Sequence, residues 1–124
     1  MEGRQRKSDM GLKTFDISIW EETIEKEFKK REEERLRALK KSKKVLKDYF
    51  KGKRVRKVFL VGSILEEGRF YPFSDIDVAV EGLIERYFKT LSEIEGLLER
   101  GVDLIELEKC RFKETIERNG IRII

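Results

Sequence analysis

The 124-residue sequence predicts an α+β fold, close to α/β in its alternation, with a small mixed β-sheet flanked by helices. Three observations support this prediction. A long N-terminal segment has apolar residues at helical spacing, two short segments then have the patterns of strands, and a helix–strand–helix pattern follows. A chain of this length fits one domain with an appendage, which here is an N-terminal helical extension.

The helical extension precedes the predicted sheet. Residues 1–14 mix charged residues with glycine and show no periodicity, so we expect a flexible tail. Residues 15–53 form the charged helical extension, whose helix ends at Gly52, because glycine is common just after a helix. Within it, residues 29–35 are charged on every side and are not expected to lie on a core. This stretch is either a solvated part of one long helix or the joint between two.

One stripe of the extension is apolar. Trp20, Ile24 and Phe28 are four residues apart, so they share a helix face that we expect to dock on the domain or on a partner. The chain's net charge of +4 comes from its N-terminal part, but charges of both signs alternate there without interleaved aromatic residues. We therefore expect a solvated helix and no nucleic acid partner. Many Glu, Lys and Arg residues with few Gln and Asn are typical of a thermophile protein.

Residues 54–124 form the predicted core domain. Its first segment ends in a β-branched apolar run, as a buried strand does, and the second alternates with period two. The longest segment is an amphipathic helix closed by Gly101, and its apolar face includes Phe88 and Leu97. The expected elements are strands at 54–61 and 74–80, a helix at 83–100, a strand at 102–107, a short helix at 112–118 and a terminal apolar segment that could form a strand.

The composition restricts the chemistry. Without histidine, the chain has no Ser-His-Asp triad, no histidine acid–base catalysis and no histidine-ligated zinc. Cys110 is the single cysteine, so we expect no internal disulfide, a half-buried apolar role and a reducing cytoplasm. No apolar run approaches the roughly 18 residues that span a bilayer, and no signal peptide pattern is present, so we expect no membrane. The groups that remain for catalysis are carboxylates, hydroxyls, Lys, Arg and a metal ion that prefers oxygen ligands.

The segment from residue 57 to residue 80 carries the candidate site. A buried strand leads into Gly62-Ser63, and twelve residues after Ser63 a second strand presents Asp75 and Asp77. Residues two apart on a strand point to the same face, so the two carboxylates lie side by side and need a compensating cation such as Mg²⁺. Backbone N–H groups at a strand-to-helix turn suit a phosphate. Metal and phosphate together indicate a nucleoside triphosphate.

Each of these residues also has a plainer interpretation. Ser63 begins the sequence S-x-x-E with Glu66, which is typical of a helix capping box, and both roles can coexist. An isolated D-x-D is more often a solvated strand edge or a turn than a metal site. The apolar residues that alternate with Asp75 and Asp77, and the Gly-Ser that precedes them, favour the site. Arg69, between the two halves, is either a solvated loop charge or a triphosphate ligand.

These residues resemble a known family. Gly62-Ser63, about a dozen residues, and then an Asp-x-Asp flanked by apolar positions are similar to the signature of the DNA polymerase beta-like nucleotidyltransferase superfamily. The short chain resembles its minimal nucleotidyltransferase (MNT) branch, the antitoxin partner of HEPN ribonuclease toxins. Val102-Asp103-Leu104 matches the family's third carboxylate, with Glu106 and Glu108 as rivals, and Ser74 matches a frequent S-D-x-D. The resemblance covers roughly residues 54–110.

The resemblance implies a reaction. Asp75, Asp77 and Asp103 would be catalytic metal ligands for Mg²⁺, with two ions expected and Mn²⁺ as a substitute, and ATP would be the substrate. Gly62 and Ser63 would hold the pyrophosphate, and Ser74 would belong to the same nucleotide-binding set. The enzyme would transfer AMP to a protein hydroxyl, a tyrosine on a HEPN toxin, and so neutralise it. An inactive nucleotide-binding or docking module is the alternative, and homo-oligomer formation is left open.

Overall fold

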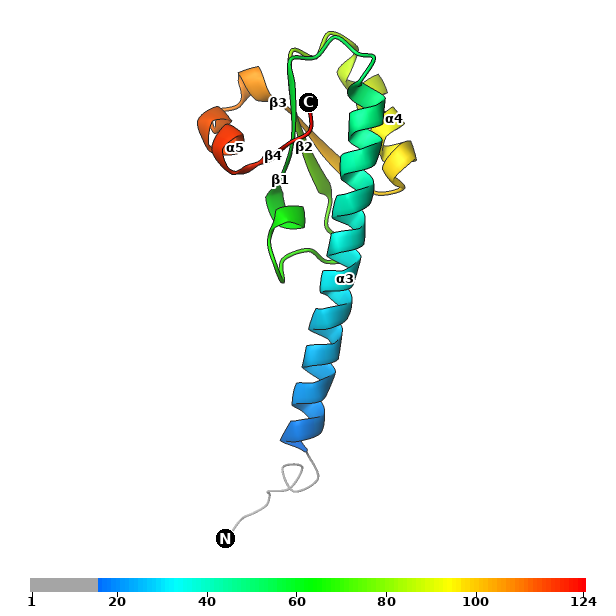
Figure 1. The fold of residues 1–124 in the computed structure, drawn as a ribbon, viewed down its shortest axis with the longest axis vertical. Helices are drawn as coiled ribbons and strands as arrows, with labels where there is room; N and C mark the ends of the chain where they lie inside the picture. The colour runs from blue at the N-terminus through cyan, green and yellow to red at the C-terminus, as the bar shows by residue number, and fades with distance from the viewer. Residues whose placement is uncertain (1–15) are drawn as a thin grey trace. The chain divides into compact units, whose positions relative to one another are not determined.

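A computed structural model describes residues 16–124, and it confirms the predicted α+β class (Figure 1). The predicted flexible tail at 1–14 lies outside the described residues. The chain divides into two compact units, residues 1–30 and 31–124. The elements are α3 (Ile17–Phe50), β1 (Lys57–Val61), the 3₁₀ helix η1 (Gly62–Leu65), β2 (Ile76–Glu81), α4 (Tyr87–Leu98), β3 (Val102–Glu106), the 3₁₀ helix η2 (Leu107–Lys109), α5 (Lys113–Asn119) and β4 (Ile121–Arg122).

The extension contains one helix. Because α3 runs unbroken from Ile17 to Phe50, the alternative of two helices with a joint is wrong. At its start, the Ser18 N–H donates to Asp16 Oδ1 at 2.9 Å, which satisfies one of the amide groups that a helix N-terminus leaves open. In the first unit, Trp20, Ile24 and Phe28 are 53%, 44% and 39% exposed. Their docking role stays a prediction.

The second unit is built around a four-stranded mixed sheet with the strand order β3-β2-β1-β4. β1 pairs antiparallel with both β2 and β4, and β2 pairs parallel with β3 through the crossover helix α4. On one face the apolar residues of the strands pack against the later part of α3 and against α4, which lie on the same side of the sheet (Figure 1). This unit begins at Arg31, so it takes in Leu46 and Phe50, both buried in that core.

The other face of the sheet carries a smaller cluster and α5 (Figure 1). Phe59, Ala79 and Leu107 are buried there, and Ile116 of α5 packs against them. A glycine ends α5, and close packing requires it. A Cβ at Gly120 would lie 2.8 Å from Val61 Cγ1 and 2.7 Å from the Ile116 carbonyl oxygen. The cluster leaves the beginnings of β2 and β3 uncovered, and the candidate site lies there.

The longest helix of the predicted core domain starts later than the pattern indicated. α4 begins at Tyr87 and not at residue 83, because Gly82 adopts φ +82° and turns the chain away from β2 before the helix starts. The expectation that Phe88 and Leu97 belong to its buried face is wrong, since they are 78% and 49% exposed. Thr90 is buried in their place.

Within residues 16–124, none of the helices combines the length and the apolar character that crossing a bilayer requires.

Candidate functional site

Two of the predicted carboxylates stand side by side across the parallel strand pair. Asp77 of β2 is the register partner of Asp103 of β3, so both side chains leave the same face of the sheet. The residues on either side of each aspartate are buried in the core on the opposite face; they are Ile76, Val78, Val102 and Leu104. Their packing fixes both aspartates on a rigid element.

Asp75 lies just outside the strand that was expected to contain it. β2 begins at Ile76, whose N–H donates to the Gly101 carbonyl at 2.9 Å, so the entry to β2 is tied to the turn before β3. The Asp75 carboxylate leans over that turn, because a Cβ at Gly101 would lie 2.3 Å from Asp75 Oδ1. The structure thus brings the three predicted aspartates to one end of two neighbouring strands.

The electrostatics of Asp77 reflect this crowding. The pKa of Asp77 is raised to about 6, first by its burial and then by the negative charges of Asp103 and Asp75. A proton or a cation bound to the Asp77 carboxylate would reduce the repulsion between the negative charges. The donors are all oxygen atoms, which suits Mg²⁺ or Mn²⁺. Within the described part of the chain, no three carboxylates or thiols already stand in a metal-ligand cluster.

The Gly-Ser motif meets the aspartates directly. β1 ends at Val61, the register partner of Asp77, and Gly62 then opens η1 with φ +81°. A Cβ at Gly62 would lie 2.1 Å from Asp77 Oδ2, so the missing side chain makes room for the carboxylate. Glycine is therefore required twice, by the backbone angle and by this contact. Sequence spacing predicted both motifs near one another but not that they touch.

Ser63 is the second residue of η1 and not its cap. Val61 occupies the cap position and makes no side-chain capping hydrogen bond, while the Ser63 carbonyl accepts from the Glu66 N–H at 3.0 Å. The capping-box interpretation of S-x-x-E is therefore wrong here. The half-buried Ser63 stays next to Gly62, and its phosphate-binding role stays a prediction.

The rival residues for the third carboxylate lie elsewhere. Glu106 is three residues beyond Asp103 and so alternates to the opposite face, where it pairs in register with Val80. Glu108 is farther along, in η2, and accepts from the Gly82 N–H at 2.8 Å. Asp103 is thus the carboxylate of this segment that lies beside Asp77.

Ser74 organises the loop that leads to the aspartates. Its hydroxyl accepts from the Tyr71 N–H at 2.9 Å, and its carbonyl accepts from Arg100 Nε at 2.7 Å. Arg100 also donates to the Tyr71 carbonyl, and its guanidinium lies 4.2 Å from the centre of the Phe70 ring. Burial lowers the pKa of Arg100, and the negative charge of Asp75 opposes that shift. The sequence analysis missed Arg100, and the nucleotide contact of Ser74 stays a prediction.

We expect Arg100→Lys to loosen this loop. A lysine keeps the charge but loses the planar fork that reaches two carbonyls, which should lower the free energy of unfolding by about 1–2 kcal/mol. Urea denaturation measures the loss, and hydrogen exchange of residues 71–76 should quicken. The exposed Arg111→Lys serves as the control. Unchanged stability and exchange in Arg100→Lys would show that these hydrogen bonds do not hold the loop.

A second support comes from the charged stretch of α3. Glu32 accepts from the Gly68 N–H at 2.8 Å, and Arg35 donates to the Ile64 carbonyl at 3.1 Å while pairing with Glu32 at 2.9 Å. The hydrogen bond from Arg35 lowers the pKa of Glu32, and the one from Gly68 adds to the effect. Residues 29–35 were expected not to lie on a core, and at these two positions the charged side chains bind loop backbone and not apolar surface.

Arg69 lies in the same loop, and the structure shows no ion pair between it and the three aspartates. It is exposed, and its N–H donates to the Glu66 carbonyl at 3.1 Å. Its triphosphate contact therefore stays a prediction.

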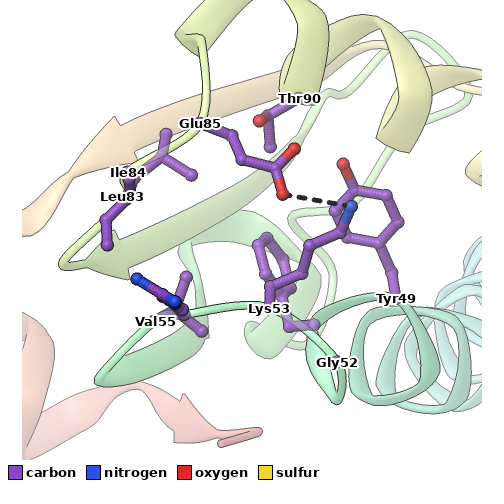
Figure 2. Close-up of a pocket in the computed structure, with 10 residues that line it drawn as sticks. Tyr49, Gly52, Lys53, Val55, Leu83, Ile84, Glu85 and Thr90 are labelled. Atoms are coloured by element: carbon purple, nitrogen blue, oxygen red, sulfur yellow. Dashed lines mark ion pairs between the residues drawn. The ribbon is translucent and has the colours of Figure 1, made fainter.

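Two of the hollows in the described structure lie beside the sheet. One, of about 330 Å³, lies at the end of β1 away from Gly62, where Lys53 pairs with Glu85 at 3.3 Å (Figure 2). None of the predicted site residues lines it. The other, of about 590 Å³, borders Gly62 and continues along α5. No aspartate lines the second hollow, but Gly62, which lies against Asp77, borders it.

The chain matches the model of a known protein family. The family model described as "Polymerase beta, Nucleotidyltransferase" matches residues 40–124, which is more than half of the chain. No curated protein matches the sequence.

Proposed function

Because this chain belongs to the polymerase beta nucleotidyltransferase family, we propose that it transfers AMP from ATP to a protein hydroxyl with Mg²⁺. The observation that carries the proposal is the junction of the two motifs: Asp77 lies beside Asp103 in register and against Gly62. Family membership supports a nucleotidyltransferase-type activity, and this junction joins the residues that such an activity needs.

The proposed chemistry assigns a role to each side chain. Asp75, Asp77 and Asp103 would hold the metal, and Asp75 and Asp103 are exposed, so packing does not oppose binding. When bound, two Mg²⁺ ions would neutralise phosphate charge and stabilise the attacking and leaving oxygens of an in-line displacement. The backbone N–H groups of Gly62 and Ser63 would hold the pyrophosphate.

The transfer itself is a substitution at phosphorus. The acceptor oxygen bonds to the α-phosphorus while the bond from that phosphorus to the bridging oxygen breaks, and pyrophosphate leaves. The proton of the acceptor hydroxyl passes to Asp103. The product is the acceptor carrying AMP, and no oxidant or further reactant is required.

The acceptor is the finer part of the proposal. The motif resemblance to the MNT branch supports a tyrosine hydroxyl on a HEPN-type toxin, which would make this protein an antitoxin. A small all-helical protein with an R-x4-6-H motif in the neighbouring reading frame is the partner to test.

Labelled ATP, Mg²⁺ and that partner test the proposal directly. We expect label on the partner, and a loss of at least about 100-fold in the Asp75→Ala plus Asp77→Ala variant. The exposed carboxylate of Asp48 on α3 gives the matched control, Asp48→Ala.

Two outcomes would overturn parts of the proposal. Label transfer that survives the double substitution would refute the metal site. Neutralisation of the partner without label, and unchanged in the double variant, would show instead an inactive module that acts by docking.

A further inference from the structure

A row of basic side chains runs along the later part of α3. Between Leu36 and Arg54 the sequence contains nine Lys and Arg residues and a single acidic residue, Asp48. Five of these cations follow one another at intervals of three or four residues, so they lie on one side of the helix. They are Arg37, Lys40, Lys44, Lys47 and Lys51, and we call them the basic stripe. The stripe is about 21 Å long, because an α-helix rises about 1.5 Å per residue.

The basic stripe lies on the solvent side of the second unit. All five of its residues are exposed, and Lys51 continues the helical hydrogen bonding past Phe50, since its N–H donates to the Lys47 carbonyl at 3.0 Å. Leu46 and Phe50 lie on the other side of the helix and are buried against the sheet. The stripe is therefore not used by the packing of the domain.

The charges of the basic stripe are also not neutralised by the protein. The adjacent Lys41 and Lys53 pair with Glu99 at 3.6 Å and with Glu85 at 3.3 Å. No ion pair of this kind joins a stripe residue to a carboxylate anywhere in residues 16–124, although Asp48 is an exposed neighbour. The stripe thus presents five positive charges that only solvent and dissolved ions compensate.

This arrangement is unfavourable for the helix itself. Residues three or four apart are neighbours on a helix surface, and like charges at that spacing destabilise the helix. Earlier in α3 the two signs alternate, and Arg35 pairs with Glu32 at 2.9 Å. The expectation of no nucleic acid partner rested on that alternation, and the basic stripe does not share it. A bound polyanion would remove the repulsion.

A duplex phosphate backbone suits the basic stripe better than a protein surface or a single strand. Protein interfaces are depleted of lysine and enriched in aromatic residues, and the stripe contains four lysines and no aromatic residue. Single strands are commonly held by rings that stack on their bases, and the stripe offers no ring. A nucleic acid duplex carries one negative charge per about 1.7 Å of its axis, so a row of this length faces more phosphates than it has cations.

We propose that the basic stripe binds the phosphate backbone of double-helical nucleic acid without reading its sequence. The stripe lies on the side of α3 away from the sheet, whereas Asp77 and Asp103 leave the face of the sheet that α3 does not cover. The duplex is therefore a docking partner and not the acceptor of the proposed transfer. This inference does not depend on the proposed function.

The salt dependence of duplex binding tests the proposal. Fluorescence anisotropy of the full chain with a labelled DNA duplex of about 24 base pairs gives the affinity between about 50 and 200 mM KCl. Five phosphate contacts predict a slope of about −4.5 for log K against log [KCl], which is a loss of a few hundredfold over this range. Replacing Lys40, Lys44 and Lys47 by glutamine should reduce the slope to about −1.8 and weaken binding at least about tenfold at 100 mM.

The matched control removes the same charge elsewhere. Lys89, Arg111 and Arg118 are exposed and lie outside α3, so their triple replacement by glutamine should leave the slope unchanged. Asp48→Asn removes the acidic neighbour of the stripe and should tighten binding. Circular dichroism checks that each variant folds, and the stripe variant should keep native label transfer.

Unlabelled competitors identify the partner. The unlabelled duplex should displace the labelled one at least about tenfold better than the same strand alone, polyglutamate or vesicles with about 30% phosphatidylserine. Equal competition by any of the three would overturn the assignment to a duplex. Equal weakening in the two triple variants would show that binding follows net charge and not the stripe. A native protein that binds no duplex at 50 mM KCl, or a stripe variant that loses transfer, would also refute the proposal.

Discussion

Replacing Gly62 by alanine will both destabilise the fold and stop nucleotide transfer. The new Cβ would lie 2.1 Å from Asp77 Oδ2 in a backbone with φ +81°, so either the strand end or the carboxylate must move. The left-handed backbone alone costs about 1–2 kcal/mol. Displacing Asp77 by the remaining overlap should lower transfer at least about 100-fold. Urea denaturation and labelled-ATP transfer measure the two effects.

Gly96→Ala is the matched control for this substitution. Gly96 lies inside α4, and a Cβ there would meet nothing within 4 Å. Alanine is the better helix former, so this variant should gain up to about 1 kcal/mol and keep full activity. Equal activity in Gly62→Ala and Gly96→Ala would refute the link between the glycine and the carboxylate.

Asp77→Asn should abolish transfer and yet stabilise the metal-free protein at neutral pH. The ionised Asp77 is disfavoured by its burial and by its neighbours Asp103 and Asp75, and an amide removes both penalties. The raised pKa means that the folded state binds the proton more tightly than the unfolded state does. The resulting stability is present below the unfolded pKa near 3.8 and is lost as pH rises through about 6.

The pH dependence provides the measurement for Asp77→Asn. The stability difference between variant and native protein in EDTA should be near zero at pH 3.8, grow with pH and level off above about 6. Because the carboxyl remains partly solvated, a plateau of about 1 kcal/mol is expected. Asp48→Asn on α3 should show no such profile. A lower stability of Asp77→Asn at pH 7 would contradict the argument.

Sequence patterns were informative where one strand or one helix decides the structure. Alternation around Asp77 predicted which side chains enter the core, because period two is a local property of a strand. The prediction that Phe88 is buried was wrong, since a stripe of apolar residues on a helix does not show which of them another element covers.

The sequence contains no pattern that predicts the contacts between distant segments. Arg100 binds the carbonyls of Tyr71 and Ser74, and Glu32 binds the Gly68 amide, so each acts on backbone groups that every residue possesses. No residue pattern marks such a partner. The contact of Gly62 with Asp77 depends on the register of β1 against β2, which only the folded sheet defines.

The strand order has one further consequence. β3 is the outermost strand beside β2, and side chains of α4 occupy two of its backbone groups: the Val102 N–H donates to Glu95 at 3.1 Å, and the Leu104 carbonyl accepts from the Tyr87 hydroxyl. Between Val102 and Ile105 the residues are apolar apart from Asp103, and Glu106 then ends the strand with a second charge. A valine at position 103 would make residues 102–105 an unbroken apolar run on an edge strand, so asparagine is the safer replacement there.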